Sequence, residues 1–452
     1  MTTEYGTLVA KQRNYFRTGA TLPLDARKDA LGRLGEAMTA FQREFADALR
    51  ADLGKSEGEI YMLELGTVMD GVRDCLANLE AWMAPEELPS PPPLQPGRSF
   101  VRHEPLGVAL IMAPWNYPVQ LTFLPLAAAL AAGNCAVLKP SPDTPRVVDV
   151  MARCVMRYFN PEHVALVPGN VAESTALLRE RFDAILYTGS TRVGKIVMEA
   201  AAKHLTPVCL ELGGKSPVVV AKDADLAVAA RRIAWGKILN AGQTCIAPDY
   251  VMAHESIVDE LLDRVNASFA AMLGPDPTAN PDYARIISDA AFDRLTALAP
   301  ANAAADRGSR KIAPVAFKAD RSHPAMEAEI FGPLLPVIPF VDAGEALEYV
   351  RSGEKPLAFY IFTQDAALAR RALELVSSGG ACVNDVLLHA ASAAMPFGGV
   401  GASGMGRYHG KYGFTFFSNV KSVLEQSATV DVPFRYPPYG EETMAMLRSM
   451  VG

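Results

Sequence analysis

The chain has few cysteines and no long apolar run. Six cysteines in 452 residues are too few for a disulfide scaffold. The most apolar stretch, 119–132, is interrupted by Pro125 and is shorter than the ~20 residues that a membrane span needs. The N-terminus has no charged segment followed by an apolar one, and the C-terminal residues 444–452 are too short and polar for an anchor. We therefore expect a cytoplasmic protein without a secretory signal or a membrane anchor.

Charge of one sign and metal-ligand spacing are also missing. The 43 Lys and Arg residues and 50 Asp and Glu residues give a net charge of −7, and no tract of like charges stands out. A nucleic-acid partner is therefore not expected. The seven histidines form no ligand-spaced pair and the cysteines form no Cys-x-x-Cys, so no metal is expected. The 50% of hydrophobic residues excludes a disordered or fibrous protein.

The hydrophobic pattern predicts an α/β protein with two domains. Residues 24–53 and 61–82 carry apolar side chains at three- and four-residue steps, which predicts two amphipathic helices. Beyond the prolines of 85–96, β-branched runs alternate with helical patterns, which is typical of parallel sheets covered by helices on both faces. We expect the domains to divide near residue 210. The expected strands are 107–113, 135–139, 164–167, 184–187, 208–212, 218–221 and 250–253, and the further helices are 119–132, 146–158 and 223–239.

Cys245 is the first candidate for chemistry. It lies in the loop 240–248, whose small and polar residues leave room for a substrate at the sulfur. A thiol is only partly ionised at neutral pH, so a nucleophilic cysteine needs nearby donors or a helix terminus. The alternative is a buried structural cysteine, and Cys75, Cys154 and Cys209 fit that alternative because each lies in an apolar pattern.

Two polar residues beside apolar strands could assist such a thiol. Glu211 ends an apolar strand, at the edge where open α/β sheets bind their ligands. Desolvation there would favour the acid form, which suits a general base. Asn116 lies between a strand and an apolar helix, and its amide could donate to an oxyanion. The alternatives are a helix or turn cap for Glu211 and a helix N-cap for Asn116.

Two further segments could bind a phosphate-bearing ligand. Gly189 and Ser190 lie where a strand runs into a helix, and the free N–H groups of a helix N-terminus attract phosphate. Lys139 closes a strand and could reach ribose hydroxyls or phosphate. A tight strand–helix turn and a solvated strand end are the respective alternatives. The segment 404–410 is closer to the Gly-x-Gly-x-x-Gly fingerprint, but no βαβ unit surrounds it.

Taken in order, these motifs resemble the aldehyde dehydrogenase superfamily. The resemblance covers about residues 1–440, and several details resemble the class 3 branch, which includes fatty, aromatic and coniferyl-type aldehyde dehydrogenases. The superfamily strings are 114–118, 138–140, 188–194, 210–217, 242–245, 329–333 and 396–399. The class 3 details are the short N-terminus and the strings 245–250, 404–410 and 435–439.

The resemblance implies NAD- or NADP-dependent oxidation of an aldehyde to the carboxylic acid, without a metal. Cys245 would attack the carbonyl, and the Asn116 amide and the Cys245 backbone N–H would hold the oxyanion. Loss of a hydride to the nicotinamide would leave a thioester, which a water activated by Glu211 would hydrolyse. The implied cofactor contacts are Lys139 on the adenosine ribose, Gly189, Ser190 and Trp115 along the pyrophosphate, Glu329 on the nicotinamide ribose, Phe331 beside the ring, and Gly194 and Leu212 in the same set.

Two positions bear on the type of reaction and on the cofactor. Acylating relatives, which pass the thioester to coenzyme A, typically lack a carboxylate at the place of Glu211, so its presence favours hydrolysis. Many NAD-preferring relatives carry a glutamate three residues after the lysine, where it binds the ribose 2′-OH and repels a 2′-phosphate. Here that position is Pro142, followed by Asp143. We therefore expect NADP to be competent alongside NAD.

The substrate is expected to be hydrophobic, either aromatic and coniferyl-like or medium- to long-chain, because aromatic side chains are candidates for the tunnel wall. Ordinary core packing is the alternative for each of them. A semialdehyde or acylating dehydrogenase of the same fold is a second possibility, and a non-catalytic structural homologue is a third, disfavoured by Cys245 and Glu211. The candidate substrate residues are Tyr117, Tyr61, Thr244 and His389.

The resemblance also implies a domain layout with a bridging element that pairs between subunits. Class 3 relatives tend to be dimers and other branches tetramers, so we expect a homodimer, with a tetramer as the alternative. The implied parts are a Rossmann-like NAD(P)-binding domain at 1–92 and 106–209, an α/β catalytic domain at 210–398, bridging strands at 93–105 and 416–428, and a C-terminal tail at 429–452.

Overall fold

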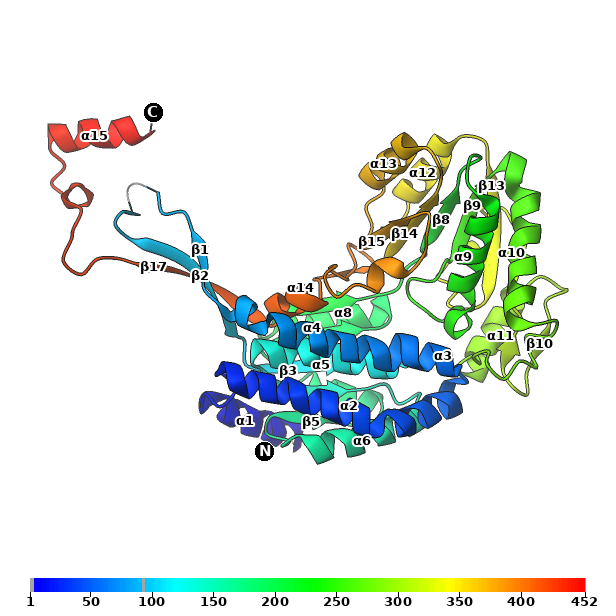
Figure 1. The fold of residues 1–452 in the computed structure, drawn as a ribbon, viewed down its shortest axis with the longest axis horizontal. Coiled ribbons are helices and arrows are strands. Elements are labelled where there is room, and N and C mark those ends of the chain that lie inside the picture. The colour runs from blue at the N-terminus through cyan, green and yellow to red at the C-terminus, as the bar shows by residue number, and fades with distance from the viewer. Residues whose placement is uncertain (1–3, 92–93, 452) are drawn as a thin grey trace.

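The structure, a computed structural model, describes residues 4–91 and 94–451 and contains two six-stranded sheets (Figure 1). The first sheet has the order β16-β7-β6-β3-β4-β5 and is parallel except for β16. Its strands are buried on both faces, which explains their continuous apolar sequences. They are β3 Val108–Met112, β4 Cys135–Lys139, β5 Val164–Leu166, β6 Ala184–Thr188, β7 Val208–Glu211 and β16 Gly404–Met405.

Helices cover both faces of the first sheet. Alternate residues of β3 point to opposite faces, and Ala109 packs with one helical layer while Val108 packs with the other. The first layer holds α2 Leu24–Leu53, α4 Gly66–Met83, α5 Pro118–Ala132 and α6 Pro145–Tyr158. The second holds α1 Glu4–Arg17, α7 Val171–Leu177 and α8 Thr191–Ala202. Helix α5 lies inside its layer, so it is apolar on every side.

The second sheet has the order β12-β13-β9-β8-β14-β15 and is parallel throughout. Its strands are β8 Pro217–Val220, β9 Tyr250–His254, β12 Val315–Lys318, β13 Leu334–Phe340, β14 Ala358–Phe362 and β15 Gly380–Val383. Helices α9 Leu226–Ile238 and α10 Val258–Leu273 pack on one face, and α12 Ala343–Ser352 and α13 Ala366–Leu375 pack on the other. Helix α11 Asp289–Leu298 belongs to a separate apolar cluster. The α/β fold is thus confirmed.

The chain passes from one sheet to the other between β7 and β8. These strands follow one another in sequence but lie in different sheets, and residues 212–216 join them. This change of sheet is close to residue 210. The exact domain limits stay predictions, and the limits placed at 92 and 93 lie outside the described residues.

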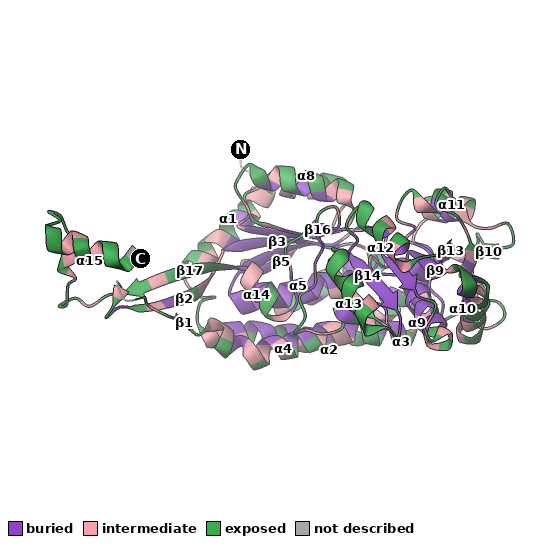
Figure 2. Ribbon diagram, turned by 90° about the horizontal axis from the view of Figure 1, so that it is seen from above, coloured by how far each residue is buried: buried purple, intermediate pink, exposed green. Residues whose placement is uncertain are grey.

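A third, antiparallel sheet projects from the body as an arm (Figure 2). It consists of β1 Glu86–Leu88, β2 Arg98–Pro105 and β17 Ser418–Glu425, with Ser418 paired to Pro105. The predicted bridging segments contain β2 and β17, but Phe416 is the last residue of α14 Gly410–Phe416 and not part of a strand. Helix α15 Glu441–Val451 lies beyond the arm. No helix among the described residues is long and apolar enough to cross a membrane.

One predicted helix needs correction. Instead of a single helix over 61–82, the chain has α3 Glu57–Glu59, a π-helical turn over Ile60–Leu65, and then α4. The Gly66 N–H donates to the Tyr61 carbonyl oxygen, and a Cβ on Gly66 would lie 2.4 Å from that oxygen. The wider turn changes the directions in which the side chains of Ile60–Leu65 point. Tyr61 is therefore 41% exposed instead of lying on the apolar face, and Glu64 is buried.

Candidate active site

The ends of the parallel strands bring the polar motifs to one edge of the first sheet. Met112 at the end of β3 is paired with Lys139 at the end of β4 and with Tyr187 in β6. Thr188 is paired in turn with Glu211, the last residue of β7. The carboxyl ends of parallel strands are where open α/β sheets bind ligands. The segments that begin after these strands therefore share one ligand-binding edge.

Cys245 lies in a tight turn after α9. Asn240 and Ala241 have φ values of 49° and 52°, and Gly242 follows with φ of 73°. A Cβ on Gly242 would meet the Gly332 carbonyl oxygen at 2.2 Å, so only glycine fits there. Tyr360 donates from its hydroxyl to the carbonyl oxygen of Ile246 at 2.6 Å and so holds the chain just after the cysteine.

The Cys245 thiol is half-buried and holds its proton. Burial raises its pKa above the ordinary value, and the negative charges of Glu329 and Glu211 raise it further. The thiol therefore needs a base before it can act as a nucleophile.

Glu211 has the environment of a group that can take a proton. Its side chain is 2% exposed, and Oε2 has no hydrogen-bond partner. Cys209 Sγ donates to Oε1 at a long 3.9 Å. Burial raises the pKa of Glu211 well above its ordinary value, although the Arg407 guanidinium opposes the shift. Glu211 caps no helix or turn, so the alternative of a structural cap is wrong.

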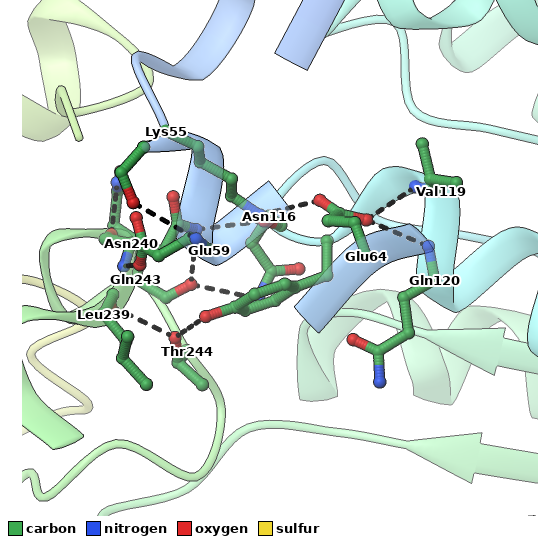
Figure 3. A network of polar contacts seen from close by, with 12 residues as sticks. Lys55, Glu59, Glu64, Asn116, Val119, Gln120, Leu239, Asn240, Gln243 and Thr244 are labelled. Atoms are coloured by element: carbon green, nitrogen blue, oxygen red, sulfur yellow. Dashed lines mark hydrogen bonds and ion pairs between the residues drawn. The ribbon is translucent and has the colours of Figure 1, made fainter. Parts of the chain in front are cut away.

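Asn116 is aimed at the cysteine loop and does not cap a helix. The N-cap of α5 is Tyr117, and it makes no side-chain capping bond. Asn116 Nδ2 instead donates to the Gln243 carbonyl oxygen at 3.0 Å, two residues before Cys245 (Figure 3). The amide nitrogen carries two hydrogens, so this bond fixes the amide and leaves one donor for a substrate oxygen.

Lys139 is buried, so the alternative of a solvated strand end is wrong. Its Nζ donates to the carbonyl oxygens of Pro140 at 2.9 Å and Gly169 at 2.7 Å. Burial lowers its pKa from the ordinary value. An ammonium group has three hydrogens, and the third remains for a ribose hydroxyl. The position thus fits the implied contact with a nucleotide.

The turn from β6 into α8 is closely packed. The Ser190 hydroxyl accepts from the Val193 N–H at 3.4 Å and caps α8. A Cβ on Gly189 would meet the Tyr187 hydroxyl oxygen at 2.2 Å, and one on Gly194 would meet Leu212 Cδ2 at 2.6 Å. The turn is therefore tight, and the helix N-terminus behind it also fits a phosphate group.

The candidates for the nicotinamide half lie between the two sheets. A Cβ on Gly213 would lie 2.1 Å from Glu329 Oε2, so the carboxyl group lies against the connection from β7 to β8. Burial and the charge of Asp249 raise the pKa of Glu329 to about 8. Trp115 and Phe331 meet edge to face with ring centroids 5.6 Å apart. A half-buried carboxyl group next to an aromatic pair fits a ribose and a nicotinamide ring.

The four substrate candidates lie at different places. Tyr117 and Thr244 are buried and hydrogen-bonded to each other at 2.8 Å, and Thr244 directly precedes Cys245 in the chain. His389 is buried behind Tyr360, with ring centroids 6.0 Å apart. Tyr61 is exposed and makes no such link. Tyr117 and Thr244 thus fit a substrate role best, and all four assignments stay predictions.

Several polar residues at this site carried no recognisable signal in the sequence. Lys55 and Glu64 form an ion pair with no solvent exposure next to Asn116, and Arg407 acts on Glu211. The string around Lys55 is typical of a surface loop, and only the fold buries it. Within residues 4–91 and 94–451, no cluster of three His, Cys, Asp or Glu side chains is placed to hold a metal ion.

A nucleotide-binding sheet edge with a thiol and a buried carboxyl group is typical of a dinucleotide-dependent enzyme. The profile of the aldehyde dehydrogenase family matches residues 2–423. The chain therefore belongs to the aldehyde dehydrogenase family, and it is an NAD(P)-dependent oxidoreductase that acts on an aldehyde.

Individual relatives agree with the class 3 resemblance. The chain is 43% identical to human aldehyde dehydrogenase family 3 member B1, over 98% of this chain and 96% of that protein. It is 40% identical to 4,4'-diaponeurosporen-aldehyde dehydrogenase of Staphylococcus aureus, over 94% of each. A structure described as the substrate-bound state of Staphylococcus aureus AldH has a TM-score of 0.97 and 37% identity, and it covers 100% of both chains.

Proposed function

We propose that this enzyme oxidises a hydrophobic aldehyde to the free carboxylic acid, with Cys245 as the nucleophile and Glu211 as the base. The observation that carries the proposal is the unpartnered, fully buried Oε2 of Glu211. Burying a carboxyl oxygen without a hydrogen-bond donor costs folding free energy, and a catalytic role would explain why the protein keeps it. Among the described residues, Cys245 is the cysteine that shares a loop with Gln243. Gln243 in turn accepts a hydrogen bond from the Asn116 side chain.

The residues act in a defined order. Glu211 takes the proton of the Cys245 thiol and releases it to solvent, and the Cys245 sulfur forms a bond to the carbonyl carbon. The free N–H of Asn116 and the backbone N–H of Cys245 hold the negative oxygen. NAD(P), when bound, supplies the acceptor for the hydride that leaves this carbon. Glu211 then takes a proton from water, which attacks the thioester and releases the acid and the thiol.

The cofactor is held by groups that fit its polar parts. The third hydrogen of Lys139 Nζ would bind the adenosine ribose, and the N-terminus of α8 behind Ser190 would bind phosphate. The Glu329 carboxyl group would accept from the nicotinamide ribose hydroxyls. Trp115 and Phe331 would pack beside the rings.

The substrate class follows from the neighbours of Cys245. Tyr117 uses its hydroxyl on Thr244, so it has no free polar group to offer a substrate. A relative that is 40% identical is named for a diaponeurosporen-aldehyde. Both observations support a hydrophobic aldehyde, aromatic or medium- to long-chain, over a semialdehyde.

A panel of aldehydes tests the proposal. The increase in absorbance of reduced cofactor is measured with benzaldehyde, coniferyl-type aldehydes, hexanal and succinic semialdehyde, each with NAD and with NADP. We expect the hydrophobic aldehydes to have the highest kcat/KM and the variant Cys245→Ala to be inactive with all of them. An active Cys245→Ala variant, or a preference for the semialdehyde, would contradict the proposal.

We also propose that the protein acts as a homodimer in the cytoplasm. The arm of β1, β2 and β17 stands away from the body, and relatives about 41% identical are named dimeric. The exposed apolar residues of the arm support its pairing with a second copy of the chain.

A further inference from the structure

We propose that Lys55 is a positioning residue, which holds the Asn116 amide in place for the oxyanion. The inference rests on the proposed role of Asn116 and extends it to a residue that does not touch the substrate. It is carried by the polar network in Figure 3, in which three separate segments of the chain meet. They are 55–64, 116–120 and 239–244.

Lys55 is an ion-paired lysine without solvent exposure. Its Nζ lies 2.7 Å from Glu64 Oε1, and both side chains are 0% exposed. The same Nζ donates to the Asn116 carbonyl oxygen at 2.7 Å. It also lies 3.7 Å from the centroid of the Tyr117 ring. The cation thus contacts the backbone of the oxyanion residue and the side chain that follows it.

Glu64 extends this contact to the start of α5. Its Oε2 accepts from the N–H groups of Val119 at 3.0 Å and Gln120 at 2.9 Å. Those are unpaired donors of the first helical turn, where a carboxylate is also favoured by the helix dipole. The Lys55–Glu64 pair therefore fixes the chain on both sides of Tyr117.

The cysteine loop binds the same carbonyl group from the other side. Asn240 Nδ2 donates to the Asn116 oxygen at 3.0 Å and to the Gln243 oxygen at 3.2 Å. Glu59 accepts from the Asn240 N–H at 2.6 Å. Two donors on the Asn116 oxygen fix its peptide plane, and the bond from Asn116 Nδ2 to Gln243 fixes its amide. Without Lys55, the Asn116 carbonyl oxygen keeps only the donor from Asn240.

The energetics of buried ion pairs favour a role in positioning. Removing two charges from water costs about as much as their attraction returns, so apolar replacements of such pairs are often neutral for stability. The proposal therefore assigns the Lys55–Glu64 pair an effect on rate, through the geometry of the Asn116 amide. Small displacements of reacting groups cost large factors in rate.

A double-mutant cycle on kcat tests the inference, with an aldehyde that the wild-type enzyme turns over. Lys55→Met keeps most of the unbranched side chain and removes its charge. We expect it to lower kcat about 10-fold in the wild-type background and less than about 2-fold in the Asn116→Ala background, because Lys55 acts through Asn116. The KM for the cofactor should stay unchanged in both backgrounds.

Two further variants separate positioning from a general loss of stability. Lys55→Met combined with Glu64→Gln removes both charges and keeps an acceptor for α5, and it replaces the single variant in the cycle if that one does not fold. Arg13→Met is the matched control, because Arg13 of helix α1 pairs with Asp183 at 2.8 Å and neither residue belongs to this network. We expect this control to keep its kcat and lose only thermal stability.

The outcomes distinguish the inference from the proposed function. An equal loss of kcat in both backgrounds, no loss in either, or a comparable loss in Arg13→Met would overturn the role of Lys55 alone. An Asn116→Ala variant with unimpaired kcat would instead overturn the oxyanion assignment, and the role of Lys55 with it.

Discussion

Burial raises the pKa of both the Cys245 thiol and the Glu211 carboxyl group. The charged form of either group appears only as pH rises, since the shifts favour the neutral thiol and the neutral carboxyl group. The proposed nucleophile and the proposed base therefore both lie in surroundings that oppose their ionisation. Once one of them ionises, its charge disfavours ionisation of the other.

Pro142 gives the first residue-scale prediction. A proline can neither accept a hydrogen bond from a ribose 2′-OH nor repel a 2′-phosphate, and the neighbouring Asp143 is exposed and accepts from Ser141 Oγ at 2.8 Å. We expect NADP and NAD to have kcat/KM values within about 100-fold, or about 2.7 kcal/mol. Steady-state kinetics with both cofactors measures the ratio.

The matched variant for this prediction is Pro142→Glu. It should lower kcat/KM for NADP and keep or raise the value for NAD, because the new carboxylate repels the 2′-phosphate and accepts a hydrogen bond from the 2′-OH. A wild-type preference for NAD above the stated limit, or equal effects on both cofactors in the variant, would argue against the role given to this position.

The sequence predicted the chemistry-bearing residues better than their surroundings. Cys245, Glu211 and Asn116 are recognisable because their types stand out beside apolar strands and glycines. Lys55 was missed because a charged residue in a polar string is normally solvated and only tertiary packing can bury it. Arg407 was missed because its effect on Glu211 depends on the fold. Lys139 was placed correctly at a strand end, but its carbonyl partners could not be read from local sequence.

At the scale of elements, apolar strands and long periodic helices were predictable. Strands such as β3, β8 and β14 are continuously apolar because they are buried on both faces, and α2 coincides with the predicted range 24–53. The π-helical turn before α4 was not predictable, because it depends on a glycine that lets a carbonyl oxygen approach. That turn changed the exposure of Tyr61 and buried Glu64.

Strand β17 gives the element-scale prediction. It pairs with β2 on one side, and Val420 and Leu424 on it are 51% and 44% exposed. Exposed apolar residues on an edge strand favour pairing with another chain. We expect light scattering to give twice the 48.5 kDa mass of one chain.

Charged substitutions on the same strand identify the interface. Val420→Asp combined with Leu424→Asp should shift the enzyme to the monomer mass, whereas Val171→Asp, at an exposed valine of α7, should leave the dimer intact. A monomeric wild-type enzyme, or a double variant that stays dimeric, would rule out this strand as the dimer contact.

At the scale of the whole molecule, the site is assembled from both sheets. Glu211 ends the last parallel strand of the first sheet, and β16 returns late in the chain to pair with it through Gly404. Cys245 arrives on the loop between α9 and β9, which belong to the second sheet. The proposed nucleophile and the proposed base therefore come together only when both sheets are formed and packed.

The central claim is a thioester on Cys245 that Glu211 helps to hydrolyse, and it is tested most directly with Glu211→Gln. We expect a burst of about one reduced cofactor per subunit followed by slow turnover, because acyl-enzyme accumulates when deacylation is impaired. Intact-protein mass spectrometry after reaction with hexanal should show the added acyl group, and the double variant with Cys245→Ala should show none. Steady, fast turnover of Glu211→Gln without an acyl adduct would contradict the account.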